Sequence, residues 1–258
     1  MDYMDYRESH QHRGADYDAT IAADAFDSYI DRWEQRHVRE IVPRTFPAKI
    51  PRYLDFACGT GRLTTVIAPL ATEVVGVDVS ESMLAKAAAK LPSARFLRAD
   101  LTTEKHDLGM FDLVSSFRFF GNAQAELRAG ALRALNALLR PGGYLLLNNH
   151  RNPNAIASLI ARVRGRDGRA TPAGGTAEGA SNTLANGELR RILTMAGFSV
   201  VEAHPIAVWQ YRARLMVTAG RNLDREARLE RMFGSSLWLP LAPDAVLLAQ
   251  KVGDAQRA

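Results

Sequence analysis

The sequence predicts an α/β protein with a doubly wound sheet, and two observations carry this prediction. Short apolar runs alternate with helical segments between residues 50 and 150, which is typical of a parallel sheet with helices on both faces. Two glycines, Gly59 and Gly61, follow the first apolar run, at the place where an open sheet of this kind binds its ligand. With a terminal pair of strands, possibly a hairpin, the expected architecture is a Rossmann-like, mostly parallel sheet of seven strands.

The expected elements follow from hydrophobic periodicity and from turn residues. Apolar residues recur at intervals of three and four from Ala22 to Ile41, which predicts a first helix. Strands are expected at 52–56, 73–79, 94–101, 111–117 and 144–149. Helices are expected between them at 61–70, 81–91 and about 127–138.

The pattern loosens after residue 150. A short helix at 152–163 is expected to turn its apolar residues inward, namely Ile156, Leu159, Ile160 and Val163. A further helix should end at Gly197, a favourable residue for a left-handed cap. The remaining expected elements are a strand at 198–209, a helix near 221–233 and a last strand at 244–252.

Composition and charge limit the class of partner. The net charge is +5 with a pI near 9.5, and the basic residues are scattered apart from the run at 162–169, which we interpret as a solvated loop. This balance is consistent with an anionic small substrate and is too weak to argue for nucleic acid. Cys58 is the single cysteine, which excludes an internal disulfide. No apolar stretch approaches about 18 residues, so we expect no membrane span, and the polar N-terminus favours a cytoplasmic protein.

The stretch LDFACGTGRLT, residues 54–64, places a turn that is bare of side chains between a strand and a helix. Such a turn lets a ligand approach the backbone closely. A phosphate-binding loop would carry Lys followed by Ser or Thr after its last glycine, and no such pair is present. A dinucleotide site would carry a third glycine where Thr64 stands. A pyrophosphate ligand is therefore disfavoured.

Acidic residues end the next two expected strands. Asp78 lies about twenty residues beyond the first glycine, where a carboxylate can accept hydrogen bonds from a ribose diol. Asp100 ends the third strand, where it could accept from an adenine amine with Leu101 beside the ring. Each signal alone is weak, since an acid at a strand end is more often a cap or a turn residue. Together they indicate an adenosine ligand without a required phosphate.

These runs, with FDLVSSF and LRPGGYLLLN after them, resemble the class I S-adenosylmethionine-dependent methyltransferases over about residues 50–150. The resemblance implies that S-adenosyl-L-methionine is the cofactor and says nothing about the acceptor. It assigns the methionine end of the cofactor to the first loop, the ribose to Asp78, and the adenine and the floor of the site to the residues that follow. The implied cofactor residues are Asp55, Ala57, Gly59, Gly61, Asp78, Val79, Asp100, Leu101, Ser116 and Phe117. Ala57 departs from the glycine that is commonest in the family, which is a conservative change.

The resemblance also suggests a division of the chain. Residues 1–48 would form a flexible segment and a cap helix, and residues 49–152 the cofactor-binding core. Residues 153–182 would form a helix and a flexible, lid-like insertion, for which an inert loop is the alternative. Residues 183–258 would complete the same sheet.

Candidate acceptor residues follow the fourth and fifth strands. A hydroxyl acceptor needs a proton acceptor, and His150 follows the fifth strand directly; a structural histidine that caps the strand is the alternative. Arg118, Asn122 and Arg151 could orient a polyol or an anion, while Phe119 and Phe120 serve either as an aromatic wall or as core. Tyr17, Tyr29 and Trp33 could shield a sulfonium cation, although an aromatic stripe on a helix is more often core. We find no cluster of metal-ligating residues in the sequence.

The sequence therefore predicts a methyltransferase that acts on a small-molecule or saccharide-like acceptor, more at oxygen than at nitrogen. The [DN]PP[YF] motif typical of enzymes that methylate nucleobase or amide nitrogens is absent after the fourth strand. Two alternatives stay open: a methyltransferase-like binding protein without turnover, and a dinucleotide-dependent oxidoreductase, which Thr64 disfavours. The sequence leaves the oligomeric state open.

Overall fold

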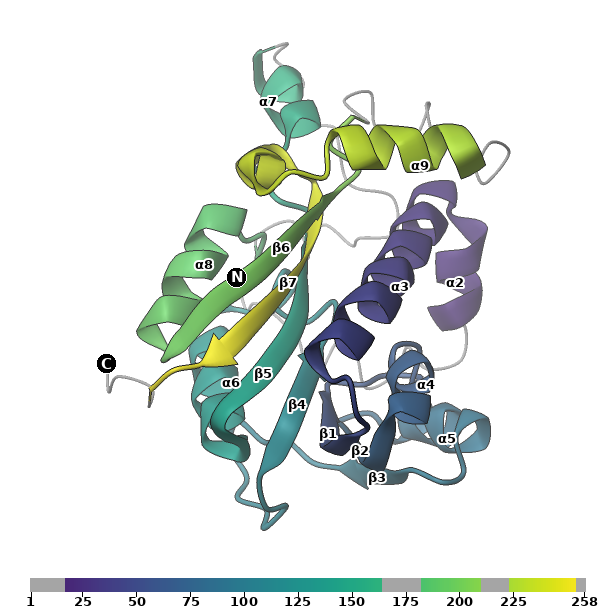
Figure 1. The fold of residues 1–258 in the computed structure, drawn as a ribbon, viewed down its shortest axis with the longest axis vertical. Helices are drawn as coiled ribbons and strands as arrows, with labels where there is room; N and C mark the ends of the chain where they lie inside the picture. Colours follow the sequence, from purple (N-terminus) through teal and green to yellow (C-terminus); the bar gives the residue numbers. More distant parts are fainter. Residues whose placement is uncertain (1–16, 164–181, 210–222, 254–258) are drawn as a thin grey trace, which may run out of the picture.

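A single seven-stranded sheet forms the centre of the computed structural model, which describes residues 17–163, 182–209 and 223–253 (Figure 1). The strands are β1 (Ile50–Phe56), β2 (Ala71–Asp78), β3 (Arg95–Arg98), β4 (Phe111–Ser116), β5 (Leu139–His150), β6 (Phe198–Ile206) and β7 (Asp244–Lys251). Their order is β3-β2-β1-β4-β5-β7-β6, and β7 alone runs antiparallel to its neighbours among the described strands. The predicted Rossmann-like, mostly parallel sheet is confirmed. Its order reverses between β1 and β4, where open sheets of this kind bind ligands.

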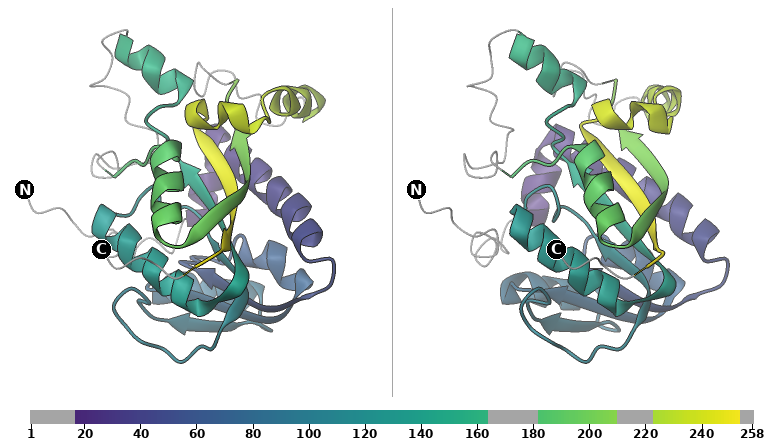
Figure 2. Two further views of the ribbon diagram at one scale, coloured as in Figure 1. Left: turned by 60° about the vertical axis from the view of Figure 1, so that its left-hand side comes forward. Right: turned by 90° about the vertical axis from the view of Figure 1, so that its left-hand side faces the viewer.

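Helices cover both faces of the sheet. The α-helices are α2 (Tyr17–Ala23), α3 (Ala25–Thr45), α4 (Thr64–Ile67), α5 (Glu81–Lys90), α6 (Ala125–Leu138), α7 (Ile156–Val163), α8 (Asn186–Met195) and α9 (Leu223–Met232), with short 3-10 helices η1 (Ala68–Leu70) and η4 (Ser236–Leu241). Helices α6 and α8 lie on one face, and α3 lies on the other (Figure 2). The alternation along β5 shows why: Leu145 and Leu147 belong to the core under α6 and α8, whereas Leu146 faces α3.

The structure differs from the sequence expectations in three places. The expected helix at 61–70 is reduced to α4 and η1, because residues 57–63 form an extended turn around the glycines. Strands β6 and β7 pair as expected but are not a hairpin, since α9 and η4 lie between them in the chain. Helix α7 forms, but its apolar residues turn inward only in part: Ile156, Leu159 and Ile160 are half-buried, whereas Val163 is exposed. The left-handed cap at Gly197 is confirmed by a φ of 82°.

Two predictions fall on residues outside the described part of the chain: the flexible N-terminal segment, up to residue 16, and most of the lid-like insertion, 164–181. The division of the chain into four segments stays a prediction. Within the described ranges, no helix has the length and apolar character needed to cross a membrane.

Candidate functional site

A cavity opens at the carboxyl ends of β1 to β4. It encloses about 890 Å³ of space, counting its open mouth. Most of the residues assigned to the cofactor line it: Asp55, Ala57, Gly59, Asp78, Val79, Asp100, Leu101 and Phe117. The structure therefore brings side chains from four strand ends to one cavity, as the sequence predicts.

Gly61 and Ser116 do not line this cavity, which corrects two of the predicted positions. A Cβ on Gly61 would lie 3.1 Å from the Cβ of Ala87, so this glycine permits the close packing of the loop on α5. Ser116 is fully buried at the end of β4.

The loop after β1 carries unusual backbone geometry. Ala57, Gly59 and Gly61 have φ angles of 55°, 55° and 76°, and for a non-glycine residue such as Ala57 this conformation costs about 1–2 kcal/mol. The glycine that is commonest in the family at this position would avoid that cost. Strain of this kind concentrates at functional sites, where the surrounding structure holds it in place.

The carboxylates of the cavity differ in how much of their hydrogen-bonding capacity is used. Asp55 accepts from Ser115 Oγ at 2.6 Å and from Thr64 Oγ1 at 2.5 Å. It is 2% exposed, and burial raises its pKa to about 6. Thr64, which occupies the place of a dinucleotide-binding glycine, thus anchors Asp55. Asp55 therefore mainly holds the start of the loop after β1 in place, and it is less available as an acceptor for a ligand.

Asp78 and Asp100 both accept hydrogen bonds at the edge of the cavity. Asp78 accepts from the backbone N–H of Gly59 at 2.8 Å and of Ser80 at 2.9 Å, one on each oxygen. Burial raises the pKa of Asp78. Asp100 accepts from Thr102 N at 2.9 Å and from Thr102 Oγ1 at 2.6 Å. Since a carboxylate offers about four acceptor positions, Asp78 can take further donors from a ligand.

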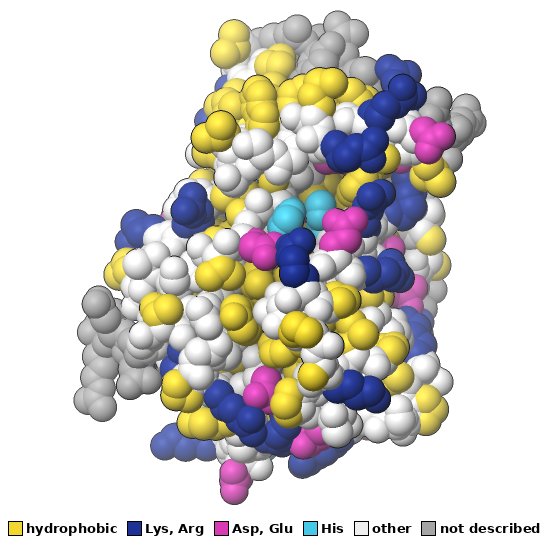
Figure 3. Space-filling model, in the orientation of Figure 1, with side chains coloured by type: hydrophobic (Ala, Val, Ile, Leu, Met, Phe, Trp, Pro, Cys, Tyr) yellow, Lys and Arg dark blue, Asp and Glu magenta, His cyan; other side chains and the backbone are white. Residues whose placement is uncertain are grey.

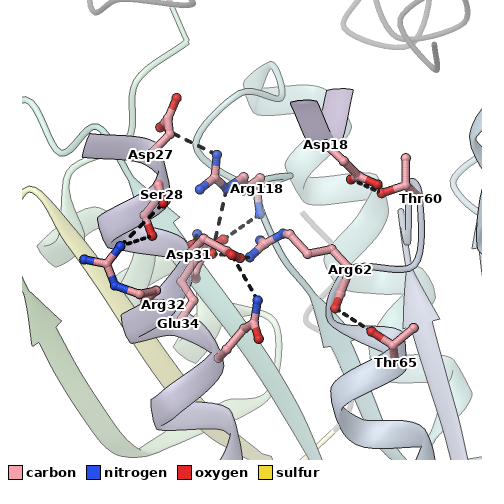
Figure 4. Close-up of polar contacts among 12 residues, drawn as sticks. Asp18, Asp27, Ser28, Asp31, Arg32, Glu34, Thr60, Arg62, Thr65 and Arg118 are labelled. Carbon is pink, nitrogen blue, oxygen red and sulfur yellow. Dashed lines mark hydrogen bonds and ion pairs between the residues drawn. The ribbon is translucent and has the colours of Figure 1, made fainter. Parts of the chain in front are cut away.

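A network of ion pairs joins α3 to the wall of the cavity (Figure 4). Arg62, in the loop after β1, contacts Asp31 and lies 2.8 Å from Glu34 Oε2. Arg118, just after β4, lies 3.8 Å from the same Glu34 oxygen and 3.6 Å from Asp27. Glu34 is fully buried, so it balances both cations in a medium where unpaired charge is costly.

Helix α2 contacts the same loop from outside. Asp18 accepts from Thr60 Oγ1 at 2.6 Å and from Lys90 Nζ at 2.5 Å. Lys90 Nζ also donates to the carbonyl of Thr60 at 3.0 Å. Thr60 lines the cavity, so α2 is fastened directly to the cavity wall (Figure 4).

The predicted acceptor residues lie in different places: some line the cavity and others lie behind its wall. Arg118 lines the cavity with a φ of 58°, an unusual conformation for a bulky side chain. His150 and Asn122 lie behind that wall, where His150 Nε2 is 3.2 Å from Asn122 Oδ1. Because an amide oxygen only accepts, Nε2 carries the proton and Nδ1 holds the lone pair. Arg151 follows β5 with a φ of 60° and is half-buried.

Tyr29 and Trp33 do not reach the cavity, which corrects their predicted place at the substrate. Tyr29 is fully buried; its hydroxyl donates to Glu230, and its ring lies 6.1 Å from that of Trp209. Trp33 is 8% exposed and packs beside Tyr29. The α3 stripe faces the sheet, so it is core, the alternative left open above. Phe120 is likewise core, whereas Phe119 lines the cavity. The side chain of Tyr17 lies outside the described part.

Comparisons of this chain with known proteins point to methyltransferases. The model of a family described as a methyltransferase domain matches residues 54–143, from β1 into β5. Trans-aconitate 2-methyltransferase of Methylobacterium radiotolerans is 32% identical over 177 residues, covering 65% of this chain and 63% of that protein. The chain is therefore similar to methyltransferases, and the likeness is concentrated in residues 54–143.

Other relatives extend the likeness. The biotin biosynthesis bifunctional protein BioCD of Bordetella avium is 37% identical over 141 residues, which cover 48% of this chain and 29% of that protein. Magnesium protoporphyrin IX methyltransferase of Synechocystis, with bound S-adenosylhomocysteine, shares the fold: the TM-score is 0.60 at 17% identity, over 95% and 97% of the two chains. The chain spans less than two thirds of the length of the curated relatives it matches.

The cavity fits S-adenosylmethionine, the cofactor that the sequence resemblance implies. Asp78 and Asp100 offer oxygens to ribose and adenine donors, and Met83 and Leu101 add apolar surface between them. Among the described residues, no group of three or more His, Cys, Asp or Glu could hold a metal ion. The dinucleotide-dependent alternative has no support from these comparisons.

Sequence reasoning missed Arg62 and Glu34. Arg62 directly follows the second glycine of the loop, so its place near the ligand could have been noticed. Glu34 lies four residues from both Ile30 and Val38, inside the apolar stripe of α3. An acid in such a stripe indicates a buried cation as partner. The sequence offers no way to choose Arg62 and Arg118 as those partners.

Proposed function

We propose that this protein transfers a methyl group from S-adenosylmethionine to a small-molecule or saccharide-like acceptor. The observation that carries the proposal is the convergence of Asp78, Asp100 and the strained loop at 57–61 on one cavity. No metal-binding cluster and no concentrated basic stripe were found in the sequence, which favours direct transfer to a small acceptor.

In this proposal the chain binds and orients, because the sulfonium of the cofactor already makes its methyl group electrophilic. Asp78 accepts hydrogen bonds from the ribose hydroxyls, and Asp100 with Leu101 contacts the adenine. The loop at 57–61 and Arg62 lie beside the methionine end. Phe117 and Arg118 separate that end from the acceptor, which is held in line in a site shielded from water.

The first test is isothermal titration calorimetry with S-adenosylhomocysteine, followed by a screen of methyl acceptors with labelled cofactor. We expect saturable binding and transfer of label to at least one small hydroxylated compound. Binding without transfer across a broad panel would support the alternative of a binding protein without turnover. No heat with S-adenosylhomocysteine, or fluorescence quenching by reduced nicotinamide dinucleotide instead, would contradict the proposal.

We extend the proposal to oxygen as the methylated atom, with His150 as the proton acceptor. Burial and the nearby arginines hold the pKa of His150 well below its ordinary value, so the imidazole is neutral at physiological pH. Its Nδ1 carries the lone pair, has no hydrogen-bond partner among the described residues and lies behind the cavity wall, beside Gly121. A hydroxyl acceptor that reaches this side of Arg118 would pass its proton to Nδ1, while S-adenosylmethionine would supply the methyl group.

The His150→Gln variant is expected to lower kcat by about 10²-fold, the usual contribution of a general base. Because the pKa of His150 is lowered, the wild-type rate should stay level as pH falls through 6.5, the ordinary histidine value. Rates from pH 5 to 9, with S-adenosylhomocysteine affinity as control, measure both effects. An acidic limb centred near 6.5, or an unchanged kcat in the variant, would show that His150 only caps β5.

A further inference from the structure

One end of the molecule carries exposed side chains that the cofactor site does not use. This apical face is formed by the outer sides of α7, α9 and η4 (Figure 1). All three elements lie at the carboxyl edge of the sheet: α7 follows β5, α9 follows β6 in the chain, and η4 leads into the antiparallel β7. The cofactor cavity opens at this same edge.

Apolar side chains project into solvent from all three elements. The exposed fractions are 90% for Val163, 86% for Leu237, 68% for Met232 and 59% for Leu223. Half of the large, exposed hydrophobic residues of the described chain thus lie on this one face. Single exposed apolar residues are ordinary, but a gathering of them marks an interaction surface.

Helix α7 adds an amphipathic element to this face. Its sequence, IASLIARV, places apolar residues on one side, and none of its side chains is buried by the rest of the described chain. The helix ends in Arg162 and Val163, both exposed. Ile156, Leu159 and Ile160 are half-buried, so the exposed end of the helix is the part that can contact an interface.

Helix α9 is oriented so that its cations face outward. Its carboxylates Glu226 and Glu230 are 2% and 5% exposed. Glu226 pairs with Arg32 at 3.3 Å, and Glu230 accepts from Trp209 Nε1 at 2.9 Å. Both acids are therefore used inside the protein.

The outer side of α9 carries Arg225, Arg228 and Arg231, with Asp224 as the single exposed acid of the helix. Arg162 adds a further cation from α7. The outer surface of the apical face is therefore cationic and apolar together, as the upper end of the space-filling view shows (Figure 3).

We propose that the apical face docks on an anionic lipid surface. Arginines attract negatively charged headgroups, and the apolar side chains between them enter the boundary between headgroups and acyl chains. An anionic lipid surface is the proposed partner because its negative charge complements the exposed arginines of the apical face. The exposed side chains of this face project outward, which suits contact with an extended surface.

The test is co-sedimentation of the full chain with vesicles of phosphatidylcholine alone and of phosphatidylcholine with one third phosphatidylglycerol. We expect binding to the anionic vesicles to exceed binding to the neutral ones by at least about tenfold and to weaken as salt is added. Equal binding to both, or binding to neither, would overturn the proposal. Self-association in light scattering without vesicle binding would also overturn it, because the face would then belong to a protein partner.

Matched variants locate the contact. Arg228→Gln with Arg231→Gln should weaken binding to anionic vesicles roughly tenfold or more, and Met232→Ser with Leu237→Ser should weaken the binding that remains at high salt. The controls are Arg190→Gln, an exposed arginine on α8, and Val252→Ser, which is 68% exposed like Met232. Circular dichroism confirms folding of each variant. Equal losses in the controls, or no loss in the apical variants, would contradict this placement.

Discussion

The Asp78→Asn variant is expected to bind S-adenosylhomocysteine at least about 10²-fold more weakly than the wild type. Two losses combine in this substitution. The ribose hydroxyls lose a charged acceptor, and hydrogen bonds to charged groups contribute about 1.5–3 kcal/mol each. The carboxylate also accepts from Gly59 N and Ser80 N, one on each oxygen. An amide must turn its NH₂ toward one of these donors, so the loop that receives the methionine end shifts as well.

Calorimetry with S-adenosylhomocysteine measures the change, and Glu81→Gln serves as the control. Glu81 lies at the start of α5, close to Asp78 in the chain, but its side chain is 83% exposed and lies 3.4 Å from Arg98. Its loss should leave cofactor affinity within about twofold, since an exposed ion pair contributes little. If Asp78→Asn folds normally and binds as tightly as the control, then the ribose is held elsewhere and the assignment of this strand end is wrong.

The sheet and the cofactor side of the site could be predicted because both depend on local pattern. An apolar run ends at a polar residue where the strand leaves the core, and parallel pairing then aligns neighbouring strand ends. Asp78 pairs in register with Arg98, which places Asp100 just beyond the same edge. The order of the motifs along the chain was therefore enough to predict that these strand ends lie side by side.

The acceptor side could not be predicted because it depends on contacts between distant segments. Tyr29 in α3 meets Glu230 in α9, 201 positions later. Periodicity shows that α3 has an aromatic stripe but not what that stripe faces. The same limit explains α7: its pattern is that of a helix with one apolar side, and only the packed structure shows that this side is half-buried.

Glu34 joins distant parts of the chain in one buried group. Its carboxylate, on α3, lies 2.8 Å from Arg62 and 3.8 Å from Arg118, and it accepts from Asn148 Nδ2 at 2.5 Å. These contacts connect α3 to the loop after β1 and to the ends of β4 and β5. Removing one partner of a buried ion pair leaves the remaining charge uncompensated, which costs about 3–5 kcal/mol.

The Glu34→Ala variant should therefore lower the free energy of unfolding by about 3–5 kcal/mol, measured by urea denaturation. Glu40→Ala is the matched control: Glu40 lies on the same helix, is half-exposed and pairs with Arg36 at 2.9 Å, so its loss should cost at most about 1 kcal/mol. Glu34→Gln keeps an oxygen for Asn148 and removes only the charge, and it should fall between the two. If Glu34→Ala destabilises no more than Glu40→Ala, then other groups on the cavity wall balance the charges of the arginines. The contact between α3 and the loop after β1 then depends on packing and not on the charge of Glu34.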